Sequence, residues 1–233
     1  MRMKDKVAVI IGAGQSPGEG MGNGRATAIV LAREGAKVLC VDNRFESAEE
    51  TAAIINKDHS GAAAAFKADV TKEAEMKAAI DEAVKRWGRL DTLHYNVGVS
   101  LGGGDKPPLE ISEEAFDKVN AINLRGFIMA CKHALPIMRE QRSGSILSIS
   151  SVAALSASYA TVAYKTTKAG MIAYTEQIAR HNAEYGVRAN IILPGLMDTP
   201  MAVDTRARVW GQPRAEVVAS RNARVPLRKT MGT

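Results

Sequence analysis

Two side chains with the chemistry of a general acid and base lie four residues apart in the segment AYKTTKAG, Tyr164 and Lys168. The segment has a helical pattern, and side chains at positions i and i+4 share one face of a helix with Cβ atoms about 6 Å apart. An ammonium group about 4 Å from a phenol is worth roughly 4 kcal/mol, which lowers the phenol pKa from about 10 by about 3 units. The pair predicts a tyrosine that exchanges protons near neutral pH, although this spacing alone is more often a structural pair.

A serine is expected beside this pair. Ser151 stands thirteen residues before Tyr164, at the end of an apolar segment that finishes in SISS. If that segment is a strand of a parallel sheet, Ser151 lies at the carboxyl edge of the sheet, where doubly wound folds bind their ligands. Its hydroxyl group is then placed to polarise a carbonyl oxygen.

A glycine-rich loop follows the first apolar segment. The stretch GAGQSPGEGMGNG contains Gly12, Gly14, Gly18, Gly20, Gly22 and Gly24 and runs into an alanine-rich helical pattern. Glycines let the backbone approach a pyrophosphate closely, and the start of the following helix attracts its negative charge. The order of strand, loop and helix favours a phosphate site. Neither GxGxxG nor the GK[ST] ending of a P-loop occurs, so a merely flexible surface loop is the alternative.

Asp42 ends the second apolar segment, eighteen residues after Gly24. A carboxylate at this position can accept hydrogen bonds from both hydroxyls of an adenosine ribose, and its charge repels a 2'-phosphate. This favours NAD over NADP, and Arg44, two residues on, softens that preference. The alternative is an aspartate that only ends the strand in a turn.

The elements that must position these residues alternate along the chain. Apolar segments of strand length are followed by longer segments of helical period, which is typical of βαβ units and a parallel sheet. We expect an α/β fold with a Rossmann-type, doubly wound parallel sheet flanked by helices, in a single domain over residues 1–233. The six expected strands are Val7–Ile11, Lys37–Asp42, Ala63–Ala68, Thr92–Asn96, Ser145–Ser150 and Arg188–Leu193. The expected helices begin near Arg25, Glu46, Lys72, Ser112 and Ala160.

Together these features resemble the short-chain dehydrogenase/reductase family, and the resemblance runs through almost the whole chain. It implies a catalytic tetrad of Asn123 in AINLRG, Ser151, Tyr164 and Lys168. In this family the tyrosine exchanges a proton with the substrate oxygen and the serine hydrogen-bonds the same oxygen. The lysine binds the nicotinamide ribose and lowers the tyrosine pKa, and the asparagine holds a water that links the lysine to solvent.

The resemblance also implies a dinucleotide site, with NAD as the cofactor and NADP less favoured. Asp69 and Val70 match the adenine contact, YNVG stands in place of NNAG, and Pro194 and Gly195 precede a threonine that contacts the carboxamide. The full expected set is Gly12, Gly14, Gly22, Asn23, Gly24, Asp42, Asp69, Val70, Asn96, Gly98, Tyr164, Lys168, Pro194, Gly195 and Thr199.

Two departures from the family pattern stand out. The glycine loop is longer than usual, and Ile11 replaces a threonine, so a hydrogen bond from Gln15 or Ser16 is expected to steady the loop instead. The segment VPLRKTMGT resembles the lead into one more helix and a seventh strand, both absent from this sequence. Either the sequence stops early, or the protein lacks an edge strand that supports the substrate pocket and a subunit interface in relatives.

Composition excludes several classes of protein. With 46% hydrophobic and 24% charged residues, the chain is not disordered, collagen-like or membrane-spanning. No apolar run approaches the roughly 20 residues of a membrane-spanning helix, and the N-terminal run is too short for a signal peptide. We expect a cytoplasmic protein that does not bind membranes. Cys40 and Cys131 are expected to be buried, and the four dispersed histidines, His59, His94, His133 and His181, to be structural or exposed, with no metal site.

The net charge of +6 is concentrated at one end of the chain. Residues 204–233 contain seven Arg or Lys and two acidic residues. A local excess favours one anionic contact or a solvated tail over a polyanion footprint, and Trp210 is the only aromatic residue there to stack on a base. We therefore expect no nucleic-acid partner.

The expected substrate is a small secondary alcohol or ketone. Residues 196–225 resemble the substrate lid of the family, and Met201, Val203, Trp210 and Val217 suggest an apolar pocket under a basic rim. A homotetramer or a dimer, built on helices within residues 112–139 and 160–185, is implied. One alternative is a reductase of 3-oxoacyl thioesters on acyl carrier protein or coenzyme A, in which Arg142 would be one basic contact while Tyr185 replaces the second. A non-catalytic dinucleotide-binding sensor is the alternative from another class.

Overall fold

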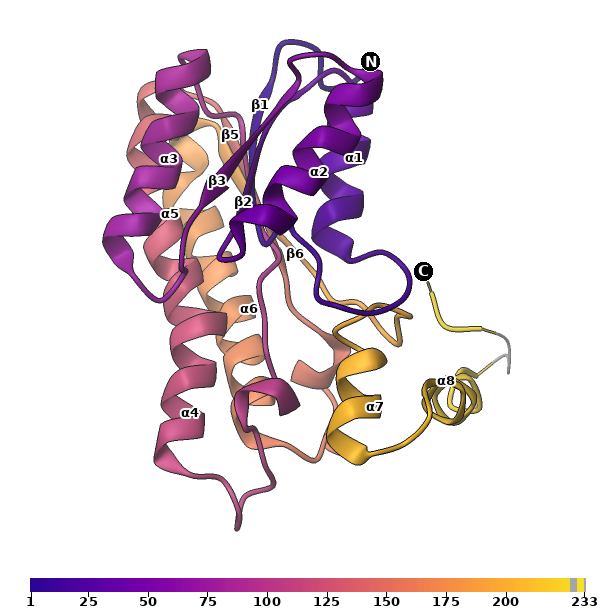
Figure 1. Cartoon of the computed structure of the whole chain (residues 1–233). Coiled ribbons are helices and arrows are strands. Elements are labelled where there is room, and N and C mark those ends of the chain that lie inside the picture. Colours follow the sequence, from indigo (N-terminus) through magenta and orange to yellow (C-terminus); the bar gives the residue numbers. More distant parts are fainter. Residues whose placement is uncertain (227–229, 233) are drawn as a thin grey trace.

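The computed structural model describes residues 1–226 and 230–232, and this part of the chain forms a six-stranded parallel sheet between two layers of helices (Figure 1). The strand order is β3-β2-β1-β4-β5-β6, so the order reverses beside β1. The strands are β1 (Val7–Ile11), β2 (Lys37–Asp42), β3 (Ala63–Lys67), β4 (Thr92–Tyr95), β5 (Gly144–Ile149) and β6 (Val187–Ile192). In the register, Ile11 lies opposite Val41 on one side and Tyr95 on the other.

Helices cover the sheet unequally. The main helices are α1 (Asn23–Arg33), α2 (Phe45–Asp58), α3 (Glu73–Trp87), α4 (Glu113–Asn120), α5 (Gly126–Glu140), α6 (Val162–Asn182), α7 (Asp204–Trp210) and α8 (Arg214–Asn222). The larger core joins α3, α5 and α6 to one face, around side chains such as Ile80, Phe127 and Met171. The smaller core joins α1 and α2 to the other face and is rich in alanine. β1 is buried on both faces because it is central, which explains why its sequence is continuously apolar.

The expected fold class is confirmed. Each predicted strand agrees with the structure within one residue at each end, and each predicted helix start agrees within two. The expected cap of α4 is present, because the Ser112 hydroxyl accepts a hydrogen bond from the Ala115 N–H group. The sequence did not indicate the π-turn over Ala121–Arg125, which joins α4 to α5.

The segment after β6 packs on its own small core. Val203, Val217 and Met231 are buried together there, although the sequence assigned Val203 and Val217 to the substrate pocket. That assignment is wrong for these two valines, because they hold α7 against α8. Met201 and Trp210 do line the cleft described below.

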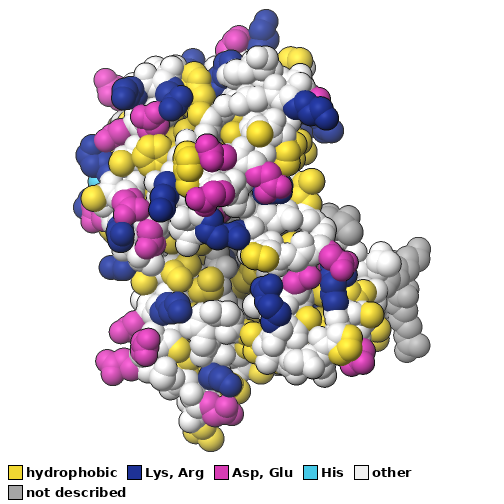
Figure 2. All heavy atoms as spheres, in the orientation of Figure 1, with side chains coloured by type: hydrophobic (Ala, Val, Ile, Leu, Met, Phe, Trp, Pro, Cys, Tyr) yellow, Lys and Arg dark blue, Asp and Glu magenta, His cyan; other side chains and the backbone are white. Residues whose placement is uncertain are grey.

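The charge distribution is mixed on the face drawn in Figure 2, where Lys and Arg side chains are interspersed with Asp and Glu. Within the described residues, no helix has both the length and the apolar character needed to span a bilayer.

Candidate active site

A cleft of about 960 Å³ runs along the carboxyl ends of the strands, at the point where the strand order reverses. It is the position at which open α/β sheets bind ligands. Of the residues expected to be catalytic or to bind the cofactor, all but two line this cleft. The exceptions are Gly24 and Asn123.

Gly24 has a packing role at the start of α1. A Cβ atom at this position would lie 1.9 Å from the carbonyl oxygen of Gly12, so only glycine fits there. Gly12 itself has φ 85°, a conformation that favours glycine. The close approach of these two glycines brings the first turn of α1 directly under the loop. Gly22 precedes α1, and no side chain caps the helix N-terminus, so its N–H groups are left for an anion.

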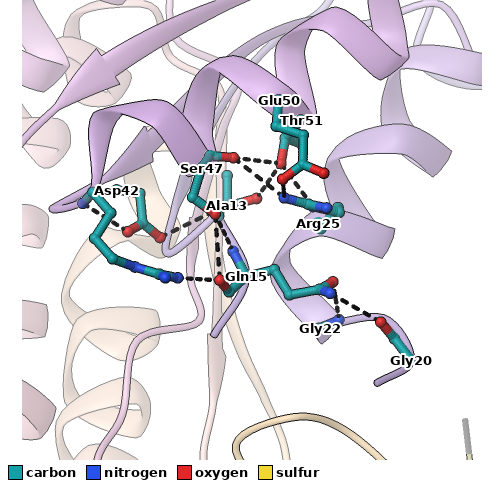
Figure 3. A network of polar contacts seen from close by, with 11 residues as sticks. Ala13, Gln15, Gly20, Gly22, Arg25, Asp42, Ser47, Glu50 and Thr51 are labelled. Carbon is teal, nitrogen blue, oxygen red and sulfur yellow. Dashed lines mark hydrogen bonds and ion pairs between the residues drawn. The ribbon is translucent and has the colours of Figure 1, made fainter. Parts of the chain in front are cut away.

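Gln15 closes the enlarged glycine loop (Figure 3). Its side chain donates a hydrogen bond to the Gly20 carbonyl at 2.9 Å and accepts one from the Gly22 N–H group at 3.0 Å. Its backbone N–H group donates to the Ser47 hydroxyl at 2.7 Å. Of the two residues expected to replace the missing threonine hydroxyl, Gln15 makes these bonds.

Asp42 is held at the end of β2 by the loop. Its carboxylate accepts hydrogen bonds from the Gly14 and Arg44 N–H groups, each at 3.0 Å. The Arg44 guanidinium reaches back and donates a hydrogen bond to the Gln15 carbonyl oxygen. The Arg44 charge, which was expected to soften a preference for NAD, is thus hydrogen-bonded to the backbone of the glycine loop.

Arg25 joins α1 to α2 beside the glycine loop (Figure 3). It is buried, and it donates to the Thr51 hydroxyl at 3.0 Å and to the Glu50 carboxylate at 2.6 Å. Thr51 in turn donates to the Ala13 carbonyl at 2.9 Å, so this pair of helices supports the backbone of the loop. Nothing in the sequence pattern distinguished Arg25 from an ordinary exposed helix residue.

The carboxyl end of β5 is where Tyr164, Lys168 and Ser151 come together. The Lys168 ammonium lies 5.6 Å from the centre of the Tyr164 ring and donates to the Ile149 carbonyl at 2.7 Å. A Cβ atom at Gly98 would be 3.1 Å from the Lys168 nitrogen, so the glycine leaves room for the lysine head group. Ser151 also lines the cleft, and its hydroxyl lowers the tyrosine pKa in part.

The electrostatics of this pair differ from the expectation. The pKa of Tyr164 is raised to about 12: burial is the main cause, the neighbouring Tyr159 also raises it, and Ser151 and Arg206 only partly oppose them. Burial also lowers the pKa of Lys168 to about 7, and this side chain is only 2% exposed. The predicted low tyrosine pKa is therefore wrong for this structure. The prediction considered the attraction between the two groups and omitted the cost of burying each charge.

Asn123 lies in the π-turn, and its side chain faces the end of β4. Its amide oxygen accepts from the Val99 N–H group at 2.8 Å, and its amide nitrogen donates to the Val99 carbonyl and the Thr167 hydroxyl. Tyr95, a departure from the family motif, braces the same turn by donating to the Ile122 carbonyl at 2.6 Å. A π-turn inside a helix is a costly feature that is frequent at functional sites.

The first turn of α6 is capped from a distant loop. The buried Asp105 carboxylate accepts hydrogen bonds from the Ala163 and Tyr164 N–H groups, each at 2.9 Å. The N-cap residue, Thr161, makes no such bond. Lys165 extends from the same turn to the Ser156 carbonyl at 2.5 Å, which ties the loop after Ser151 to the helix. The sequence indicated neither contact. Asp105 lies far from α6 along the chain, and no spacing rule relates Lys165 to Ser156.

An ion network joins the glycine loop to α7 and α8. Arg214 contacts Asp198 at 2.6 Å, Asp204 at 3.4 Å and Glu19 at 3.6 Å. Asp204 also accepts a hydrogen bond from the Glu19 N–H group at 3.3 Å. We call these four residues the loop–lid network. The inserted part of the glycine loop is thus attached to the segment after β6.

Arg142 does not lie at the entrance of the cleft. It precedes β5 and therefore sits at the amino end of the sheet, opposite the carboxyl end that carries Ser151. Its guanidinium donates to the Glu184 carbonyl at 2.6 Å and lies over the Tyr185 ring. The expected contact of this arginine with a carrier-bound substrate is not supported within one chain.

Comparison with known proteins gives a consistent result. Residues 6–210 match the model of the family described as short chain dehydrogenase. Levodione reductase of Leifsonia aquatica is 36% identical over 201 residues, which cover 86% of this chain and 72% of that protein. The 2-(R)-hydroxypropyl-CoM dehydrogenase of Xanthobacter autotrophicus is 33% identical over 229 residues, which cover 98% and 86% of the two chains. The crystal structure of levodione reductase superposes with a TM-score of 0.91 at 31% identity, over 99% of this chain and 87% of that one.

Proposed function

Because this chain belongs to the short-chain dehydrogenase family, we propose that it transfers hydride between NAD and a secondary alcohol or ketone, with Tyr164 as general acid and base. The observation that carries the proposal is the convergence of Tyr164, Lys168 and Ser151 at the carboxyl edge of β5, inside the cleft. Membership of the family makes the chain an oxidoreductase that uses a nicotinamide cofactor; the choice of NAD and the assignment of each residue are our proposals.

The residues present fit a dinucleotide. The uncapped N-terminus of α1 would hold the pyrophosphate, Asp42 would accept hydrogen bonds from the adenosine ribose, and Asp69 with Val70 would face the adenine. Asp42 favours NAD because its charge would oppose a 2'-phosphate, and because the nearby Arg44 is engaged with the loop backbone. When bound, the nicotinamide supplies the hydride chemistry.

The remaining cofactor contacts are assigned to other residues of the same cleft. We assign these contacts to Gly12, Gly14, Gly22, Asn23, Asn96, Gly98, Pro194, Gly195 and Thr199, all of which line the cleft. Asn96 also donates a hydrogen bond to the Gly12 carbonyl at 3.2 Å, and this contact supports a role in holding the loop in place. Gly24 acts through packing, since it lets α1 approach Gly12.

Proton transfer is assigned to the buried tyrosine and lysine. Burial keeps Tyr164 protonated at neutral pH, which suits a group that donates a proton to the oxygen of a ketone during reduction. Ser151 would hydrogen-bond the same oxygen. Lys168, whose pKa is about 7, can gain or lose a proton near neutral pH and can therefore restore the tyrosine proton. Asn123 is assigned as a positioning residue that holds Val99 and Thr167 and a water that connects Lys168 to solvent.

Residues 196–225 are proposed as a lid over the substrate end of the cleft. The support is that Met197, Met201, Arg206 and Trp210 line the cleft, and that α7 and α8 have a small core of their own. A homotetramer or dimer built on helices within residues 112–139 and 160–185 remains a proposal that follows from the family.

The test is a fluorescence titration of the chain with NADH and with NADPH, followed by turnover assays on secondary alcohols with the cofactor that binds. Binding of NADH in preference to NADPH, with turnover, supports the proposal. Preference for NADPH contradicts the role of Asp42. Binding without turnover on any alcohol or ketone contradicts the catalytic role and favours a sensor, and binding of neither cofactor contradicts the dinucleotide site.

A further inference from the structure

Three arginines lie together on the lid side of the cleft. Arg206 belongs to α7, Arg221 lies at the end of α8, and Arg224 follows in the next turn, with its N–H group bonded to the Arg221 carbonyl at 3.1 Å. All three line the cleft. We call them the arginine cluster.

The central member of the cluster is buried and has no counter-ion among the residues that the structure describes. Arg221 is 8% exposed, and its guanidinium contacts the Met231 sulfur at 3.0 Å and the Met197 carbonyl at 3.4 Å. No carboxylate of residues 1–226 and 230–232 lies within 4.0 Å of any of the three guanidinium groups. Burial and the charges of Arg206 and Arg224 lower the pKa of Arg221 to about 10. A buried cation surrounded by like charge is costly, and such groups are normally paired.

The acidic residues nearby have other partners. Asp198 and Asp204 are both held by Arg214, the neighbouring arginine of the loop–lid network. Asp105 is held by the first turn of α6, and Glu110, which lines the same cleft, is exposed and forms no ion pair with the cluster within the described residues. Arg214 therefore has three carboxylate contacts, whereas the arginine cluster, which belongs to the same segment after β6, has none within the described residues.

The cluster and the reacting residues Tyr164 and Ser151 line the same cleft. Tyr159, which also lines it, has its ring centre 5.6 Å from that of Tyr164. A ligand that reaches Tyr164 and Ser151 with one end can therefore reach the cluster with another part. The apolar side chains on the same wall are Met197, Met201, Val209 and Trp210.

We infer that the substrate is a secondary alcohol or ketone that also carries a carboxylate or another oxyanion, which the arginine cluster binds. The inference rests on the proposed function, because it names the class of substrate for that same site. The oxyanion supplies the negative charge that the cluster lacks, and arginine binds such groups through two parallel hydrogen bonds. The pyrophosphate of the cofactor is the competing anion, and the proposed function already assigns it to the N-terminus of α1, where the N-cap residue Gly22 has no side chain.

The experiment compares matched pairs of substrates and variants. The substrates are 3-hydroxybutanoate and 5-hydroxyhexanoate against their methyl esters, which differ in charge and not in the reacting alcohol. We expect a higher kcat/KM for at least one acid than for its ester, by about tenfold or more. Arg221→Met and Arg206→Met should abolish this preference, while Arg221→Lys should keep part of it. Arg188→Met removes the same charge from the exposed amino end of β6 and should leave the preference unchanged.

Two further measurements separate the possible failures. The Kd for NADH is measured in each variant; a loss of NADH affinity with an unchanged acid preference would assign the cluster to the cofactor and overturn the inference. Direct binding is followed by Trp210 fluorescence in a Trp87→Phe background, with hexanoate against hexanamide as ligands. This readout needs no turnover: hexanoate binding that is lost in Arg221→Met supports the inference, and equal binding of both ligands overturns it. Failure of the proposed function itself would appear separately, as an absence of NADH binding in the unmodified chain.

Discussion

Asp105 caps the helix that carries Tyr164: one oxygen of its carboxylate accepts the Tyr164 N–H group at 2.9 Å, across 59 residues of chain. The other oxygen accepts the Ala163 N–H group at the same distance. The position of the tyrosine along the cleft therefore depends on a loop that contains three consecutive glycines, GGG, and two prolines.

Replacement of Asp105 should reduce both stability and turnover. We expect Asp105→Ala to lower the free energy of unfolding by about 1–3 kcal/mol, because two buried N–H groups lose a charged acceptor. Since the first turn of α6 also loosens, kcat should fall by more than KM rises. Urea denaturation and steady-state kinetics measure the two effects. Ser112→Ala removes the cap of α4 and should cost about 1 kcal/mol without changing kcat. Equal kcat in the Asp105→Ala and unmodified proteins would contradict the positioning role.

Tyr164→Phe should abolish turnover and leave NADH binding within about threefold, because the change removes one hydroxyl group and keeps the ring. Stopped-flow assays and fluorescence titration with NADH test the two halves of the prediction. Retained activity would reject Tyr164 as the general acid and base.

Lys168→Met should remove activity and yet stabilise the chain at neutral pH. The pKa of Lys168 is about 7 in the folded chain, against about 10.4 in an unfolded one. Between these values the unfolded chain binds one more proton than the folded chain, so the cost of burying the ammonium is largest below about pH 7 and disappears as the pH rises toward about 10.

The corresponding measurement is urea unfolding of both proteins from pH 6 to pH 10. We expect the variant to be more stable by a few kcal/mol at the lower end, with the difference shrinking as the pH rises. A constant difference across the range would show that the lysine is not buried in this way. A wild-type pH profile of activity in the variant would remove the catalytic role of Lys168.

Asp42→Asn should shift the cofactor preference toward NADP. The amide keeps an acceptor for one of the two N–H groups that hold Asp42 and removes the charge that opposes a 2'-phosphate. We expect the ratio of kcat/KM for NADP to that for NAD to rise by about tenfold or more, since one unit charge near a phosphate is worth at least 1 kcal/mol. An unchanged ratio would show that Asp42 only ends the strand.

Removal of Arg214 should release α7 and α8 from the glycine loop. Arg214→Met breaks three ion contacts, two of them to carboxylates that are mostly buried. We expect faster amide hydrogen exchange in residues 196–225 and in the glycine loop together, with little change in β1 or β4. Glu19→Gln is the matched control: Glu19 is 77% exposed, so its loss should have a small effect. Faster exchange confined to α8 would contradict a mechanical connection to the loop.

The sheet was predictable because its physical causes are local. Strands buried on both faces need continuous apolar runs. In this sequence, a segment with helical periodicity separates most of these runs from the next. The register follows once a parallel order is assumed. The residues of the cleft were also predictable as a set, because the carboxyl ends of parallel strands bring Asp42, Asn96 and Ser151 to one edge.

The parts that were not predictable depend on contacts between distant segments. Asp105 reaches α6 from a loop with no recognisable pattern, and Tyr95 supports the π-turn through a single hydroxyl group. The pKa of Lys168 depends on how completely the surrounding chain excludes water, which spacing within one helix does not report. Ion pairing was not predictable for the same reason. Arg214 pairs with acidic residues from three segments, whereas Arg221 has no acidic partner within the described residues, and local sequence distinguishes neither case.

The loop–lid network has a thermodynamic consequence for the order of events in the cleft. Arg214 joins the glycine loop, proposed to bind the cofactor, to residues 196–225, proposed to cover the substrate. A shift of either segment would then be transmitted to the other. If binding of the first ligand changes the affinity for the second by some factor, thermodynamic linkage requires that binding of the second change the affinity for the first by the same factor. Isothermal titrations done in both orders should therefore give the same coupling factor, and Arg214→Met should reduce that factor toward one.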